Sequence, residues 1–226
     1  ELGTRMAAIL DAAGIPFCDG GIMAKNAEWR GSVKLWESRI EEWVSHTNPQ
    51  NLLNVDIFFD QAAVHGSREL SMRLFRKAFE AGSQNVGFAK ALGANVENIA
   101  SPFNMFGRIR GENNRLDLKL HGLFPLVAGT RALAIRHNVA THSTQNRLAG
   151  LIALDKGDVG LLSRLSEHHA FLLALMLQNQ EREIASGRKP TNFVDLGQLD
   201  KGQTARLKDA LSDIQYIPNL VRDMMF

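Results

Sequence analysis

Two aspartates spaced four residues apart are the first feature of this sequence that could do chemistry. Asp56 and Asp60 lie in the apolar run NVDIFFD, which predicts a strand over residues 54–60. Residues an even number apart on a strand point to the same face, so the two carboxylates could bind a hard cation such as Mg²⁺. Alternatively, Asp56 faces solvent and Asp60 ends the strand as a turn former, and the residues alone favour this local structural role.

A second polar group follows in the segment LDLKLHG, where Asp117, Lys119 and His121 alternate with leucines. On one strand face they could hold a phosphate or a ribose, with Lys119 as a point charge and His121 as a donor or proton carrier. A solvated face whose charges pair across the strands with Arg108 and Arg110 fits the same pattern equally well.

Arg131 interrupts an apolar helical stretch between Val127 and Leu133. Burying an unpaired charge costs a great deal of free energy, so a buried Arg131 must have an acidic partner or contact a ligand. Asp117 and Asp60 are the candidate partners.

These side chains are carried by an expected α+β fold that is mostly α. Two strands are predicted near the N-terminus, one within IPFCDGGIMA (15–24) and one over 54–60, and a β-hairpin is predicted over 106–120 around the turn GENN. Apolar residues at helical spacing predict a bundle in the second half. The predicted helices cover 1–14, 32–47, 67–82, 123–137, 143–154, 158–186 and 203–215.

Composition and charge disfavour several classes of protein. The 226 residues are 45% apolar and 22% charged, as in soluble globular domains, and no apolar run approaches the roughly 18 residues of a membrane-spanning helix. A formal net charge of +2 disfavours nucleic acid as a partner, and a single cysteine excludes an internal disulfide and fits the cytoplasm. The chain opens inside a helical pattern without a cap or leader, which suggests a piece of a longer protein.

The order of motifs along the chain resembles one protein family from end to end. GIPFCDGGIMAKNAEWRGSVKLW is followed by LLNVDIFFDQAAVHGSREL, LDLKLHGLFPLVAGTRALA, STQNRL, LLALMLQNQ and PTNFVDLGQLDKGQTARLKDAL. The family is the C-terminal part of bacterial nucleotidyltransferases that are related to the protein-PII uridylyltransferases. Its members often carry CBS and cyclic-nucleotide-binding domains ahead of the nucleotidyltransferase core.

The resemblance implies a division into two parts. Residues 1–80 would be the C-terminal portion of a polymerase-β-like nucleotidyltransferase core, with a remnant of its sheet, and residues 81–226 would be a helical substrate-binding domain. The Gly-Ser helix start and the Asp-x-Asp strand of the core are absent, because neither Gly31-Ser32 nor Gly82-Ser83 is followed by an Asp-x-Asp motif. The isolated chain is therefore expected to be inactive.

The resemblance also suggests cofactors and partners. Mg²⁺ and a nucleoside triphosphate are expected in the intact protein and not in this fragment. The expected partners are the upstream nucleotidyltransferase and sensor domains of the same chain, a PII-like protein acceptor and a second copy in a homodimer; neither nucleic acid nor a membrane is expected.

The family pattern selects particular residues. Asp60 matches the acid of a Phe-Phe-Asp motif and is the candidate metal ligand, although Gln61-Ala62 and Ser67 depart from the pattern around it. The expected substrate contacts are Asp117, Lys119, His121, Arg131 and Arg147. The leading hypothesis is the substrate-binding part of a uridylyltransferase-like enzyme in a signal-transduction protein. The alternative is a non-enzymatic scaffold that relays signals from upstream sensor domains.

Overall fold

The computed structural model describes residues 1–97 and 99–225. Helices dominate this part of the chain and a single pair of short strands accompanies them, so the predicted α+β, mostly α, class is confirmed. No helix in the described ranges is both long enough and apolar enough to cross a membrane. The helices are α1 (Leu2–Ala12), α2 (Val33–Ser45), α3 (Pro49–Phe58), α4 (Arg68–Gln84), α5 (Val86–Ala94), α6 (Phe124–Arg136), α7 (Thr144–Ala153), α8 (Val159–Ala185), α9 (Lys201–Gln215) and α10 (Ile217–Met224). The strands are β1 (Arg115–Asp117) and β2 (Phe193–Asp195); short helical turns are η1 (Ala27–Trp29), η2 (Lys119–Leu123) and η3 (Leu196–Gln198).

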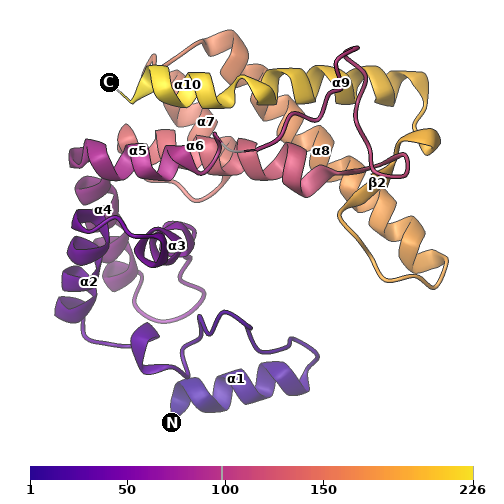
Figure 1. The fold of residues 1–226 in the computed structure, drawn as a ribbon. Helices are drawn as coiled ribbons and strands as arrows, with labels where there is room; N and C mark the ends of the chain where they lie inside the picture. Colours follow the sequence, from indigo (N-terminus) through magenta and orange to yellow (C-terminus); the bar gives the residue numbers. More distant parts are fainter. Residues whose placement is uncertain (98, 226) are drawn as a thin grey trace.

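Helix α6 is the centre of the molecule. It packs against α4, α5, α7 and α10, and Figure 1 shows α9 and α10 lying along one side of the layer formed by α5 and α6. Gly129 permits the close approach of α10, because a Cβ at this position would lie 2.3 Å from Cγ2 of Ile217. Nearly every residue of α6 from Pro125 to Ile135 is buried, including Arg131, its one buried charge.

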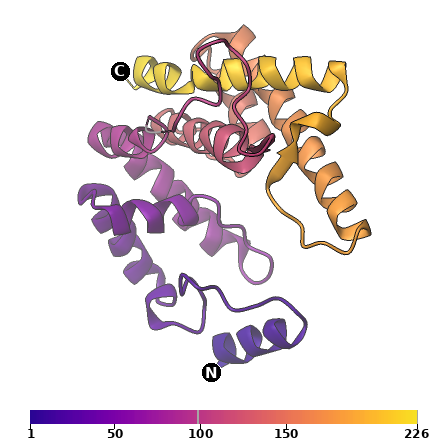
Figure 2. The same cartoon turned by 45° about the vertical axis from the view of Figure 1, so that its right-hand side comes forward.

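Helices α2, α3 and α4 form a second group at one end of the α5–α6 layer. They enclose an aromatic core in which Phe79 of α4 contacts both Phe75 and Phe59, the residue that directly follows α3. Helix α1 stands away from the other helices, as the two views in Figures 1 and 2 show, and lies against the loop that follows it, where a Cβ on Gly3 would come within 2.4 Å of the Ala24 carbonyl oxygen.

The predicted helices are confirmed, with ends that differ by a few residues at most. Helix α4 begins where expected, because the Ser67 hydroxyl accepts a hydrogen bond from the Leu70 amide and so satisfies one of the free amides of the first turn. Helices α6 to α9 correspond in the same way to the four helices predicted between residues 123 and 215.

The strand predicted over 54–60 is wrong, because these residues belong to α3 and the turn after it. Pro49 stands at the first position of α3, and the Asn48 side chain accepts a hydrogen bond from the Asn51 amide at 2.9 Å. Proline lacks an amide hydrogen that the first helical turn leaves unbonded anyway, so proline after an asparagine favours a helix start. Asp56 lies on α3 and Asp60 lies in the turn that follows it.

The strand predicted within 15–24 is also wrong, since this stretch forms loops and turns. Its short apolar runs flank an Asp-Gly-Gly sequence, and Gly21 has a φ of +70°, which only glycine adopts easily. All of residues 1–80 are described and none lies in a strand, so the expected remnant of a polymerase-β-like sheet is not found there.

A small antiparallel pair of strands is present, but its partners differ from those predicted. The turn at GENN forms as expected, with Asn113 and Asn114 at positive φ. However, β1 pairs with β2, in a register that places Leu116 opposite Val194. Residues 119–123 then wind into η2 instead of continuing the strand.

The buried carboxylate of Glu183, on α8, forms hydrogen bonds that hold this strand pair against the helix. Glu183 is 3% exposed, and its carboxylate accepts hydrogen bonds from the Thr191 amide at 2.6 Å, the Thr191 hydroxyl at 2.9 Å and the Arg115 guanidinium at 3.2 Å. Burial alone would raise the pKa of Glu183, but the hydrogen bonds from Thr191 and the charge of Arg115 outweigh it and lower the pKa below its usual value.

This lowered pKa predicts an acid-sensitive contribution to stability. The folded state binds a proton at Glu183 less readily than the unfolded state does, so the stabilisation is complete above the unfolded pKa of about 4.3 and is lost as the pH falls through the lower folded value. Urea unfolding of the wild type and of Glu183→Gln should therefore differ most at neutral pH, and the difference should shrink in acid. A difference between the two proteins that stays constant with pH would contradict this assignment.

Candidate functional site

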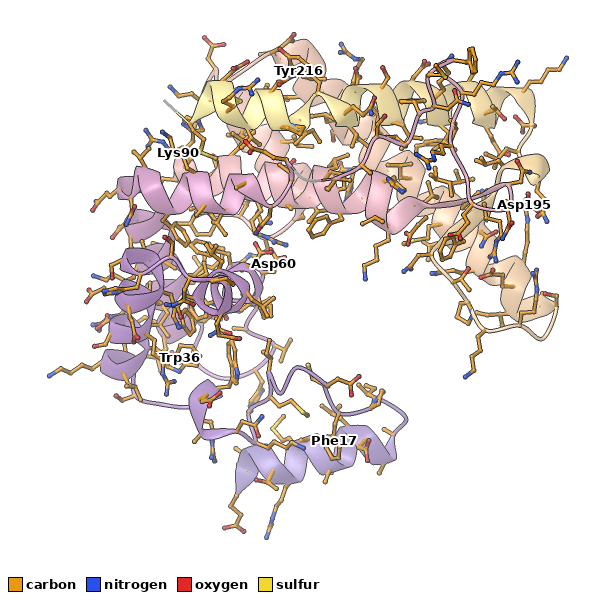
Figure 3. The ribbon with its side chains drawn as sticks, in the orientation of Figure 1. Phe17, Trp36, Asp60, Lys90, Asp195 and Tyr216 are labelled. Atoms are coloured by element: carbon orange, nitrogen blue, oxygen red, sulfur yellow. The ribbon has the colours of Figure 1, made fainter. Side chains whose placement is uncertain are left out.

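Two clusters contain most of the residues singled out by the sequence, and Asp117 and Lys119 lie in neither. The first, here called the junction cluster, joins the end of α3 to α6 and α7 and consists of Asp56, Asp60, Arg131 and Arg147. Arg131 lies 2.5 Å from a carboxylate oxygen of Asp56 and 2.5 Å from one of Asp60, and Arg147 lies 2.7 Å from the other oxygen of Asp60. Figure 3 shows Asp60 between α3 and α6. Of the two predicted candidate partners of Arg131, Asp60 is confirmed and Asp117 is not, and Asp56 is a further partner that was not predicted.

Burial of the two arginines strengthens the interaction among the four charges of the junction cluster. The Arg147 side chain is 1% exposed, and it also donates to the carbonyl oxygens of Phe59 and Thr141, each at 3.0 Å. Burial lowers the pKa of Arg147, against the opposing charge of Asp60. Burial acts on Arg131 in the same direction, but Asp56 and Asp60 outweigh it and raise the pKa. Two guanidinium groups and two carboxylates balance to zero charge, which is how buried charges are tolerated.

Asp60 does not fit the expected role of metal ligand. Both of its carboxylate oxygens already accept hydrogen bonds from arginines, and a divalent cation placed there would face two guanidinium charges. Within residues 1–97 and 99–225, no group of three or more histidine, cysteine or acidic side chains could hold a metal ion. The residues present therefore do not fit a bound Mg²⁺.

The same ion pairs block the two arginines that were expected to contact substrate. The structure brings Arg131 and Arg147 together, but a substrate anion would have to displace Asp56 or Asp60 to reach either guanidinium. We assign to these arginines the positioning of α3 against α6 and α7.

The second cluster, here called the Arg110–His121 pocket, has a volume of about 570 Å³. The loop before β1 supplies Arg110 and Glu112, and η2 supplies His121. Gly111 lies between them at a point where a Cβ would come within 2.9 Å of the Arg115 backbone, so only glycine fits without a shift of the loop. Ala100, Ser101 and Gly111 complete the lining.

His121 has unused hydrogen-bonding capacity at this pocket. Its Nδ1 is buried, and it has no hydrogen-bond partner among the described residues. Buried polar atoms are nearly always paired, so this ring nitrogen is available to a water molecule or to a ligand in the pocket. The Arg110 guanidinium and the Glu112 carboxylate line the same pocket, so the arrangement suits a ligand that has an anionic group for Arg110 and a hydrogen-bond donor for Glu112.

The predicted row of Asp117, Lys119 and His121 does not form, because the strand ends at Asp117 and η2 begins at Lys119. Asp117 has a local role, since its carboxylate accepts a hydrogen bond from the Leu120 amide at 2.9 Å. Lys119 is exposed, and no acidic residue in the described ranges forms an ion pair with it.

From the sequence, Arg110 was expected only as a charge partner across the hairpin. Neither Ser101 nor Glu112 was expected at a site. The GENN turn is the one sequence feature that could have placed Arg110 and Glu112 near the start of β1. The proximity of Ser101 could not have been found this way, because Ser101 is held by a hydrogen bond from Gln215 of α9, more than a hundred positions away.

Comparison with known protein families gives two matches. Residues 87–224 match the family described as "Putative nucleotidyltransferase substrate binding domain", and residues 1–50 match the family described as "Putative nucleotidyltransferase DUF294". No curated protein and no solved structure gives a match. The first family covers more than half of the chain, including the whole Arg110–His121 pocket and both junction arginines. The chain belongs to the nucleotidyltransferase substrate-binding domain family.

Proposed function

We propose that this chain is the substrate-recognising portion of a uridylyltransferase-like enzyme in a cytoplasmic signal-transduction protein, and that the Arg110–His121 pocket receives an anionic group of the acceptor. The observation that carries the proposal is the buried, unpartnered Nδ1 of His121 beside the Arg110 guanidinium, within the segment that matches a substrate-binding family. Lys119 is exposed and lies two residues before His121 in the chain, and we keep it as a candidate acceptor contact.

In the intact protein, a nucleotidyl group would pass from a nucleoside triphosphate to the acceptor and pyrophosphate would leave. The triphosphate and its Mg²⁺ would belong to the catalytic part of the protein, and a PII-like protein is the acceptor class that we propose. The contribution of this chain is to hold the acceptor in a defined position, which converts an encounter in solution into a reaction between fixed groups.

We also propose that the chain divides near residue 80, into a part that continues the nucleotidyltransferase core and a substrate-binding part. The family matches support this division, because one ends at residue 50 and the other begins at residue 87. The junction cluster would then hold the two parts in one orientation, since Asp56 and Asp60 precede the boundary and Arg131 and Arg147 follow it.

Substitution of His121 tests this function. In the intact protein, His121→Ala should lower kcat/KM for the acceptor at least about tenfold, because a hydrogen bond to a charged group contributes roughly 1.5–3 kcal/mol. The thermal stability should change little, since Nδ1 of His121 has no partner to lose among the described residues. Steady-state transfer from a triphosphate labelled at the α-phosphate measures this effect.

His46→Ala is the matched control, because His46 is an exposed histidine outside the pocket and its substitution should leave kcat/KM unchanged. Arg110→Gln should resemble His121→Ala. Wild-type kinetics in His121→Ala and in Arg110→Gln would refute acceptor binding at this pocket.

A further inference from the structure

A pocket lined by tryptophans lies in the N-terminal part of the chain, apart from both clusters described above. It is formed between η1, α2, the end of α3 and the loop that leads to α4, and its volume is about 390 Å³. This volume lies within the usual range for small-molecule sites. The residues that matter below are Trp29, Trp36, Phe58, Gln61, His65 and Ser71.

The apolar walls of the pocket are aromatic rings with suitable geometry for stacking. The ring centroids of Trp29 and Trp36 are 6.0 Å apart, and those of Trp36 and Phe58 are 5.5 Å apart with nearly parallel planes at 28°. Trp43 lies against both tryptophans on the buried side, so all three tryptophans of the sequence are in this cluster. Trp29 and Trp36 are only partly buried. The Arg39 guanidinium lies over the Trp36 ring, 5.0 Å from its centroid, so Trp29 offers the freer ring surface to a ligand.

Polar side chains stand on the same pocket. Within the described residues, the Gln61 amide, the His65 ring and the Ser71 hydroxyl make no hydrogen bond to other side chains or to the backbone. An amide offers both donors and an acceptor, and a neutral imidazole and a hydroxyl can each do both. A flat ligand with donors and acceptors along its edge satisfies such groups, whereas a purely apolar ligand leaves them unpaired.

A smaller pocket of about 230 Å³ adjoins the tryptophan pocket and shares Ala63 and Ser71 with it. Arg68 and His142 line this smaller pocket. A guanidinium next to an aromatic pocket is suited to a ligand that joins a ring to a phosphate, because arginine binds phosphate oxygens through paired N–H groups.

We propose that the tryptophan pocket binds the base of a nucleotide, with the phosphates toward Arg68. Every nucleobase has a flat face that stacks on tryptophan, and its edge carries the donors and acceptors that Gln61, His65 and Ser71 can meet. The proposal goes beyond the proposed function: it gives the base of the donor nucleotide a site in the part of this chain before residue 80, which we propose continues the nucleotidyltransferase core. It concerns binding alone and does not depend on the acceptor pocket.

Tryptophan fluorescence of the 226-residue chain tests the proposal directly, because all three tryptophans lie at this site. Titration with UTP and with ATP should change the fluorescence saturably for at least one of them, and calorimetry should give the same affinity. Inorganic tripolyphosphate, which has phosphates but no base, should bind at least about tenfold more weakly, since stacking of one base contributes a factor of this size or more.

Ala63→Phe is the decisive variant, because Ala63 lies on the pocket wall and is exposed, so a larger side chain fills the cavity without removing a buried contact. It should weaken nucleotide binding at least about tenfold, by loss of stacking. Ala94→Phe, at an exposed alanine at the end of α5, is the matched control and should bind as the wild type does. Arg68→Gln should reduce the ratio of the affinity for the nucleoside triphosphate to the affinity for the free nucleoside.

Two results would overturn the proposal: no saturable response to either nucleotide, or nucleotide binding that survives unchanged in Ala63→Phe. Because no acceptor and no transfer enter the measurement, failure of the proposed transfer reaction leaves this test unaffected.

Discussion

Asp60→Asn is expected to lower the free energy of unfolding by about 3 kcal/mol, near the lower end of the range for breaking a buried ion pair. The substitution removes the anion that contacts both Arg131 and Arg147, and the Arg147 side chain is only 1% exposed. The effect falls at the lower end because the Asp60 side chain itself is 40% exposed and water can solvate part of the site. Urea unfolding measures the difference.

A second substitution separates the loss of an ion pair from simple disruption. Asp60→Asn combined with Arg147→Met removes the buried guanidinium together with its partner, so the double variant should be more stable than the sum of the single effects predicts. Asp19→Asn, at an exposed aspartate, should change the stability by less than about 0.5 kcal/mol. Two results would show that the junction cluster does not hold α3 against α6 and α7. One is that the effects of the two single substitutions simply add, and the other is a loss of unfolding free energy below about 1 kcal/mol in Asp60→Asn.

Phe79→Ala is expected to cost about 3–5 kcal/mol, the usual effect of removing a large side chain from a packed core. Phe79 is fully buried, and its ring lies 4.8 Å from the rings of both Phe59 and Phe75. These rings join α4 to the turn that carries Asp60, so the cavity would also loosen the junction cluster. Urea unfolding should show a lower midpoint with a similar slope.

Phe106→Ala is the matched control for this prediction. Phe106 is 79% exposed, so the same chemical change should alter the stability by no more than about 0.5 kcal/mol. Equal losses in Phe79→Ala and Phe106→Ala would contradict the assigned core.

The helical part of the fold follows from sequence patterns because it depends on neighbouring residues. Apolar spacing on α4 places Phe75 and Phe79 inward, and Ser67 caps the helix through a side chain three residues before its amide partner. These are local effects, and residue types along a short window determine them. The pairing of Arg131 with Asp60 could be predicted for a different reason, since a buried charge must have a partner and few acids are candidates.

The strands could not be predicted as reliably, for two physical reasons. The run NVDIFFD has a strand-like composition, but Asn48 and Pro49 start a helix ahead of it, and α3 then buries Val55 and Phe58. The partner of β1 lies about eighty residues away in β2, where Val194 faces Leu116. No local pattern carries information on such a distant pairing.

The candidate site shows the same limit. Sequence patterns identified His121, but they placed it on a strand with Asp117 and Lys119, whereas η2 places it on a pocket with Arg110. Sequence patterns do not indicate the tryptophan pocket, because Trp29 and Trp36 come close to Gln61 and His65 only when α3 and the turn after it pack against α2. Residue types could be read from the sequence, and their grouping depended on tertiary packing.

The most direct test of the central claim is nucleotidyl transfer by the intact protein. The protein is incubated with Mg²⁺, a nucleoside triphosphate labelled at the α-phosphate and a PII-like acceptor, and label on the acceptor is measured. The account predicts label on the acceptor with wild-type protein and at least about tenfold less in His121→Ala under subsaturating acceptor. Absence of label on any acceptor with each of the four common triphosphates would contradict the account and favour a non-enzymatic scaffold.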